Sequence, residues 1–143
     1  MSDVKVAPAI VAISHGPLCV AALESARMIF GELDRVSALP LEEGMDPEEY
    51  QSKLKNLIDS YEGNVFVVCD ILGGTPFNSL MQLSREYRLH GASGLSLPLL
   101  LELLSGRDEL SGDELGKVAL ESCLQVNNDL SEMLEKLWCM GRR

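Results

Sequence analysis

Two ionisable residues in this sequence stand where apolar runs of strand length end. His15 follows the run 9–14, and Gly16 comes directly after it. Asp70 follows the run 65–69, and a glycine-containing turn comes next. Runs rich in Ile, Val and Ala without alternation indicate strands that are covered on both faces, as in parallel sheets. If the two strands are neighbours, the imidazole and the carboxylate meet at one edge of the sheet.

The chemistry that suits this pair is phosphoryl transfer. An imidazole nitrogen accepts a phosphoryl group only when it carries no proton. A carboxylate that accepts a hydrogen bond from the other ring nitrogen fixes that tautomer and stabilises the positive charge that develops, as in a hydrolytic triad. We therefore predict that Asp70 orients His15, and that His15 is the nucleophile.

A phosphoryl group also needs hydrogen-bond donors. Backbone N–H groups in glycine turns and at helix amino ends supply them, because glycine lets the main chain approach the phosphoryl oxygens closely. The hydroxyl groups of the serine and the threonine in these turns would add two donors. The predicted phosphoryl-binding residues are Ser14, Gly16, Gly73, Gly74 and Thr75.

Each candidate also has a simpler structural interpretation. A histidine after a strand can be an ordinary turn residue, Asp70 can cap its turn, and the pair 73–74 can be a plain glycine turn. Thr75 is expected to cap the following helix in any case. His90, the second histidine, is interpreted as a surface residue without a partner. Only the pairing of His15 with Asp70 at two strand ends favours chemistry.

The elements that must position these residues alternate along the chain. The predicted fold is α/β, with right-handed βαβ units that form a doubly wound, open and mainly parallel sheet with helices on both faces. The expected strand order is 2-1-3-4, which places the site beyond the carboxyl ends of the first and third strands. We predict strands over about 8–13, 36–39, 65–70 and 89–95, and helices over about 17–30, 47–61, 76–83, 98–104 and 113–137.

Composition restricts the class of protein. With 143 residues, 46% of them hydrophobic, residues 1–143 are predicted to form one globular domain. A formal net charge of −10 argues against nucleic acid as a partner. The four cysteines lack CxxC spacing, so we expect no metal and no disulfide framework. No run is long and apolar enough to suggest a membrane segment, and a cytoplasmic location is expected.

Three stretches together resemble a known family. They are Val-Ala-Ile-Ser-His-Gly at 11–16, Cys-Asp-Ile-Leu-Gly-Gly-Thr-Pro-Phe-Asn at 69–78 and Gly-Leu-Ser-Leu-Pro-Leu-Leu-Leu-Glu at 94–102. Over about residues 7–125 the chain resembles the IIA domain of the mannose/fructose/sorbose-type phosphoenolpyruvate-dependent sugar phosphotransferase system. The string Asp-x-x-Gly-Gly-Thr-Pro-Phe-Asn is the specific part. Ser96 departs from many relatives, which have asparagine there.

The resemblance implies roles for these residues. His15 corresponds to the histidine that the phosphocarrier protein HPr phosphorylates and that passes the group to a histidine of the IIB component. Asp70 corresponds to the orienting aspartate, and residues 73–75 to the loop that lines the phosphoryl site. The resemblance also implies a phosphotransferase without a cofactor. It further implies a homodimer whose subunits exchange an extra antiparallel edge strand.

Three alternatives remain open at this point. The chain could be the related phosphotransfer subunit of dihydroxyacetone kinase, although the Gly-Gly-Thr-Pro string favours the sugar system. It could be a regulatory module that keeps the site and senses phosphorylation. It could also bind a small phosphate-containing ligand without a covalent step. Covalent attachment of a phosphoryl group to the protein would distinguish the kinase subunit and the regulatory module from a protein that only binds a phosphate-containing ligand.

Overall fold

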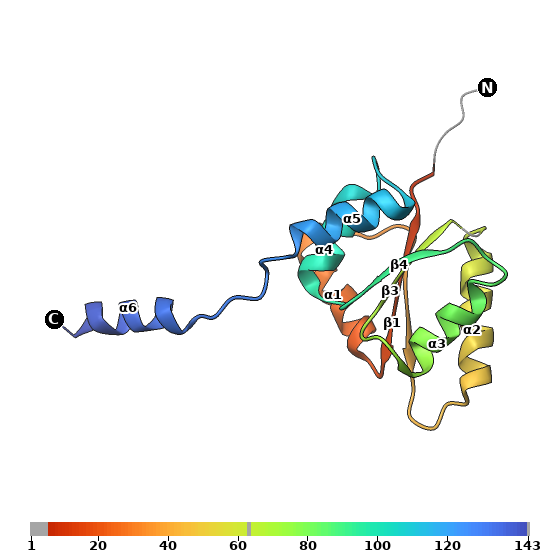
Figure 1. Ribbon diagram of the computed structural model, residues 1–143, viewed down its shortest axis with the longest axis horizontal. Helices are drawn as coiled ribbons and strands as arrows, with labels where there is room; N and C mark the ends of the chain where they lie inside the picture. Colours follow the sequence, from red (N-terminus) through yellow and green to blue (C-terminus); the bar gives the residue numbers. More distant parts are fainter. Residues whose placement is uncertain (1–5, 63, 143) are drawn as a thin grey trace.

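The computed structural model describes residues 6–62 and 64–142. Strands and helices alternate up to β4, as expected, and three further helices follow (Figure 1). The strands are β1 (Ala9–His15), β2 (Val36–Leu41), β3 (Val65–Cys69) and β4 (His90–Ser93). The helices are α1 (Leu18–Phe30), α2 (Pro47–Ser60), α3 (Gly74–Leu83), α4 (Leu97–Gly106), α5 (Gly112–Ser122) and α6 (Ser131–Gly141).

The four strands form one parallel sheet in the order β2-β1-β3-β4, which confirms the predicted fold class and strand order. The register of β1 with β3 places Ile13 opposite Cys69. The residues that follow these two positions therefore emerge at the same edge of the sheet. No antiparallel strand is present in the sheet within the described part of the chain.

Helices cover both faces of the sheet. Side chains of the central strands alternate between the faces, so Ile10 and Ala12 pack with α1, α4 and α5. Val11 and Ile13 point the other way and pack with α2 and α3. Figure 1 shows these two layers on either side of the strands. This double covering explains why β1 and β3 are apolar at successive positions.

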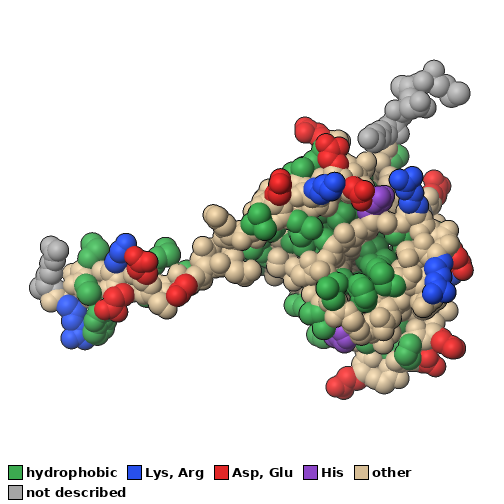
Figure 2. Space-filling view, viewed as in Figure 1, with side chains coloured by type: hydrophobic (Ala, Val, Ile, Leu, Met, Phe, Trp, Pro, Cys, Tyr) green, Lys and Arg blue, Asp and Glu red, His purple; other side chains and the backbone are tan. Residues whose placement is uncertain are grey.

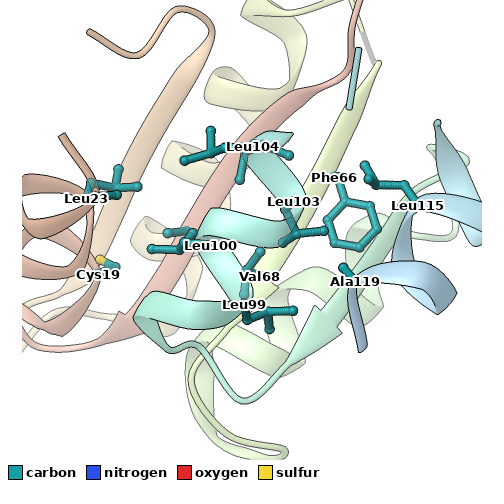
Figure 3. Packing of buried hydrophobic residues seen from close by; sticks show 13 residues of the cluster. Cys19, Leu23, Phe66, Val68, Leu99, Leu100, Leu103, Leu104, Leu115 and Ala119 are labelled. Atoms are coloured by element: carbon teal, nitrogen blue, oxygen red, sulfur yellow. The ribbon is translucent and has the colours of Figure 1, made fainter. Parts of the chain in front are cut away.

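The leucine-rich run of α4 belongs to the core rather than to a ligand pocket. Leu100 and Leu103 are fully buried and belong to the same cluster as Leu115 and Ala119 of α5, and Leu103 lies beside Phe66 of β3 (Figure 3). Burial of a leucine side chain contributes roughly 1.5–3 kcal/mol to stability. The packing of α4 and α5 thus fixes β3, the strand that carries the aspartate.

Two helices start at side-chain caps. Asp46 accepts a hydrogen bond from the N–H of Glu48 at the start of α2. Ser96 accepts one from the N–H of Leu99 at the start of α4. The polar residue that departs from the family pattern therefore serves as a helix cap in this chain.

The prediction of one continuous helix over 113–137 was wrong. Two separate helices, α5 and α6, occupy this region, and the segment between them has neither helix nor strand. The side chain of Asn128 donates to the carbonyl of Gln125, and that of Asp129 accepts from the N–H of Ser131. Such local side-chain bonds compete with helix formation. α6 projects from the folded body and buries none of its residues (Figure 1).

Candidate active site

His15 and Asp70 meet at the carboxyl edge of the sheet, as predicted. One carboxylate oxygen, Oδ2 of Asp70, lies 2.9 Å from both the backbone nitrogen and the ring Nδ1 of His15. The other oxygen, Oδ1, accepts from the N–H of Ile71 at 2.9 Å. The side chain of His15 is 42% exposed and that of Asp70 is 9% exposed. The carboxylate is thus enclosed, while the ring faces solvent.

The pKa of Asp70 lies below its ordinary value. Partial burial alone would raise this pKa, but the hydrogen bonds from the backbone and ring of His15 and from Ile71 outweigh it. Asp70 is therefore ionised at neutral pH and can only accept hydrogen bonds. Since the carboxylate accepts, Nδ1 of His15 carries a proton, so Nε2 holds the lone pair when the ring is neutral.

The lowered pKa makes a prediction about acid stability. A carboxyl group with a lower pKa in the folded state stabilises the fold above its unfolded pKa of about 3.9, and this contribution is lost as the pH falls through the folded-state pKa. Below about pH 4 the free energy of unfolding of the wild type should therefore fall more steeply than that of Asp70→Asn. Urea unfolding at a series of pH values measures both slopes, and equal slopes would contradict the hydrogen-bonded carboxylate.

Gly74 lies against the reactive nitrogen. A Cβ atom built on Gly74 would stand 2.6 Å from Nε2 of His15 and 2.7 Å from the neighbouring ring carbon. The backbone φ of Gly74 is +83°, a value that residues other than glycine rarely adopt. Because glycine has no Cβ, the main chain at the start of α3 can lie close to a phosphoryl group on Nε2. Any other residue at position 74 would place a side chain against the ring.

Gly74→Ala should slow phosphorylation by about tenfold or more, because the methyl group would displace the ring, and small misplacements of reacting groups are costly. Gly31→Ala is the matched control. Gly31 has a φ of +93°, but a methyl group on it would meet no atom within 4 Å, and it ends α1 away from the site. Both variants carry backbone strain, so the initial rate of phosphorylation is compared after both are shown to be folded. Equal slowing of the two would refute the close approach.

Gly73, rather than Thr75, is the N-cap of α3, and it makes no side-chain capping bond. The predicted cap at Thr75 was therefore wrong: the helix already begins at Gly74, so Thr75 lies in its first turn. The first N–H groups of a helix have no carbonyl partner within it. The N–H groups of Gly74 and Thr75 are thus available as donors beside Nε2, together with the positive end of the helix dipole.

Two of the predicted phosphoryl donors are already occupied. The N–H of Gly16 donates to the carbonyl of Leu41 at 2.8 Å, which joins the His15 turn to the end of β2. Ser14 is fully buried, and its hydroxyl donates to the carbonyl of Gly16 at 2.9 Å. Neither group points to the open side of the site. Of the predicted donors, the N–H groups of Gly74 and Thr75 at the start of α3 have no partner within the helix, a distinction that residue types alone could not make.

A groove of about 740 Å³ opens beside His15. It is lined by residues of the His15 turn and of the connection between β2 and α2, which contributes the exposed carboxylates Glu42 and Glu43. Exposed apolar side chains lie on the other side of Asp70, where Ile71 is 58% exposed and Leu72 is 70% exposed. The histidine thus stands between an acidic edge and an apolar edge.

The second histidine does have a partner, which the sequence interpretation missed. Nδ1 of His90 lies 3.2 Å from Oδ1 of Asp113, and the His90 side chain is 29% exposed. Because His90 begins β4 and His15 ends β1, the two histidines lie at opposite ends of the parallel sheet. The two purple histidine side chains in Figure 2 are correspondingly far apart. His90 also packs against Gly112, at the start of α5. No pattern in the sequence indicates that α5 brings a carboxylate to this position.

No three potential metal ligands among His, Cys, Asp and Glu cluster within residues 6–62 and 64–142. In the same ranges, none of the helices is both long and apolar enough to cross a bilayer.

Comparisons with known proteins identify the family. The family model described as "PTS system fructose IIA component" matches residues 9–119. This chain belongs to that family. It is thus a IIA component of a phosphotransferase system for sugar uptake, and such components are phosphotransferases.

Individual relatives agree with this assignment. The fructose-specific EIIA component of Bacillus subtilis is 35% identical over 128 residues, which cover 86% of each chain. The sorbose-specific EIIA component of Klebsiella pneumoniae is 35% identical over 104 residues, covering 71% of this chain and 76% of the relative. A crystal structure of an EIIA component from Streptococcus agalactiae superposes with a TM-score of 0.80 at 28% identity, covering 87% of this chain and 98% of that one.

Proposed function

We propose that this IIA component relays a phosphoryl group from HPr to the IIB component, with His15 as the carrier. The observation that carries the proposal is the bond between Nδ1 of His15 and Oδ2 of Asp70, which makes Nε2 the nitrogen with the lone pair in the neutral, partly exposed ring. The glycine turn at the start of α3 lies against that nitrogen. A side chain that only closed a turn would not require this arrangement.

In the first step, the lone pair of Nε2 attacks the phosphorus of phosphohistidine on HPr. The new bond from Nε2 to phosphorus forms as the bond from phosphorus to the HPr nitrogen breaks, and the HPr imidazole leaves with that electron pair. The second step repeats this exchange, with a histidine of IIB as the attacking group. Because the donor is already an activated phosphoramidate, the protein supplies mainly positioning and charge stabilisation.

Two groups stabilise the charges that develop. As Nε2 binds phosphorus, the ring becomes positive, and the adjacent carboxylate of Asp70 compensates that charge through Nδ1–H. The phosphoryl oxygens are negative and face the free N–H groups of Gly74 and Thr75. Ser14 and Gly16, which the sequence suggested as donors, instead shape the turn that holds His15.

The partners are proposed to dock on the rim around His15. The apolar edge, with Leu72 exposed and Phe77 and Leu97 partly exposed, offers a surface that can be covered transiently. Glu42 and Glu43 on the opposite edge favour a partner with cationic side chains around its own histidine. This assignment fits a cytoplasmic protein that meets HPr and IIB in turn. A homodimer, as the resemblance implies, remains part of the proposal.

Incubation with phosphoenolpyruvate, enzyme I and HPr tests the function. Intact-protein mass spectrometry should show one added phosphoryl group per chain, which is lost in acid and retained in base. Addition of IIB should remove it. A protein that only binds a phosphate-containing ligand would gain no covalent mass, and a protein that keeps its label in the presence of IIB would be a regulatory module instead.

A further inference from the structure

The hydroxyl of Ser14 joins three parts of the His15 turn, although it is fully buried. Its Oγ donates to the carbonyl of Gly16 at 2.9 Å and accepts from the N–H of Cys19 at 2.9 Å. Ser14 itself is a residue of β1. One hydroxyl group therefore connects the end of the strand, the left-handed glycine and the first turn of α1.

This hydroxyl replaces the usual cap of α1. The N-cap residue, Pro17, makes no side-chain capping bond, and Cys19 is the second residue of the helix. The N–H of a second helical residue has no partner within the helix. Ser14 satisfies it from inside the sheet. The start of α1 is thus fixed to the residue that immediately precedes the nucleophile.

Gly16 is fixed from two sides. Its carbonyl accepts from Ser14, and its N–H donates to Leu41 of β2. Its φ of +63° reverses the chain directly after His15. The main chain on both sides of His15 is therefore held, and the N–H of His15 itself donates to the oxygen of Asp70 that also binds its ring.

We propose that Ser14 is a positioning residue for phosphoryl transfer, which sets the His15 backbone so that one oxygen of Asp70 can bind both its N–H and its Nδ1. Without the hydroxyl, the Gly16 turn and the start of α1 can shift. The backbone N–H and the ring of His15 then no longer reach Oδ2 of Asp70 together. The ring loses its fixed tautomer, and Nε2 is protonated for part of the time. This inference rests on the function proposed above.

Ser14→Ala tests this positioning role, and Ser79→Ala is the matched control, since Ser79 is also buried, at 3% exposure, but lies within α3. Rates are measured with HPr as the donor over a range of HPr concentrations. Ser14→Ala should lower kcat by roughly tenfold. It should leave KM for HPr nearly unchanged, because the hydroxyl is not on the docking surface. Ser79→Ala should match the wild type in both.

The state of the ring supplies a second readout. Nitrogen-15 NMR of the imidazole should show Nδ1–H with a bare Nε2 in the wild type, and a mixture of tautomers in Ser14→Ala. Ser14→Cys keeps the shape of the side chain with weaker hydrogen bonding, so it should fold and show an intermediate effect. It remains informative if Ser14→Ala is unstable.

Two results would overturn the proposal. Either kcat and the ring spectrum of folded Ser14→Ala or Ser14→Cys equal those of the wild type, or Ser79→Ala changes both as much as Ser14→Ala does. Failure of the relay itself would look different, because the wild-type protein would then accept no phosphoryl group from HPr at all.

Discussion

His15→Ala is expected to abolish phosphorylation of this IIA component, from one phosphoryl group per chain to none. The methyl group of alanine has no lone pair to attack phosphorus, and in the described part of the chain no other imidazole lies at this edge of the sheet. The fold should persist, because the His15 side chain is 42% exposed and Asp70 keeps its bonds to two backbone N–H groups. Mass spectrometry after incubation with enzyme I, HPr and phosphoenolpyruvate measures the loss.

His90→Ala provides the control for this experiment. The sequence contains two histidines, and each has a carboxylate partner on Nδ1. His90, however, lies at the other end of the sheet, without the glycine turn of α3. His90→Ala should therefore retain a full phosphoryl group. Labelling that survives in His15→Ala and disappears in His90→Ala would move the acceptor to His90 and reject the proposed site.

The strand ends were predictable because two simple patterns agreed. Uninterrupted apolar runs identified β1 and β3 as central strands, and the alternation of strands and helices implied their adjacency. The carboxyl ends of neighbouring parallel strands meet at the same edge of a sheet, and the register places Ile13 opposite Cys69. The meeting of His15 with Asp70 followed from these constraints.

The choice among the predicted donors could not be made from the sequence, because residue type does not determine which groups are already bonded. Ser14 and Gly16 have the expected chemistry, but tertiary contacts with Cys19 and Leu41 occupy their polar groups. The side chain of Thr75 predicts a cap at that residue, whereas α3 begins at Gly74, in a turn of two glycines with positive φ. The spacing of residues within one strand or helix does not reveal hydrogen bonds that connect it to other elements.

The end of the chain shows a second limit. An apolar stripe at helical spacing continues through residues 113–137, and this favoured a single helix. The break at 123–130 depends on Asn128 and Asp129, whose side chains bond to nearby backbone groups. The pairing of His90 with Asp113 was missed for a similar reason, because it depends on how α5 packs against β4.

Asp70→Asn is expected to slow transfer from HPr by roughly 10²-fold or more, the order of magnitude lost when a group that stabilises developing charge is removed. In the wild type, both carboxylate oxygens of Asp70 accept hydrogen bonds. The asparagine amide has an oxygen that accepts and an NH₂ group that donates. If its oxygen faces His15, its NH₂ group faces the N–H of Ile71. If its NH₂ group faces His15, it meets the backbone N–H and donates to Nδ1, which moves the ring proton to Nε2 and blocks attack. In either orientation the charge that compensates the developing imidazolium is lost.

Asp113→Asn separates this effect from a general loss of charge. It removes one negative charge from a histidine–carboxylate pair at the other end of the sheet, so the net charge of the two variants is equal. Single-turnover labelling with saturating HPr compares their transfer rates, and nitrogen-15 NMR of His15 reports the tautomer in each. Asp113→Asn should match the wild type in both measurements. A normal transfer rate in Asp70→Asn would mean that Asp70 only closes its turn, and that the bare Nε2 of His15 is held by something other than this carboxylate.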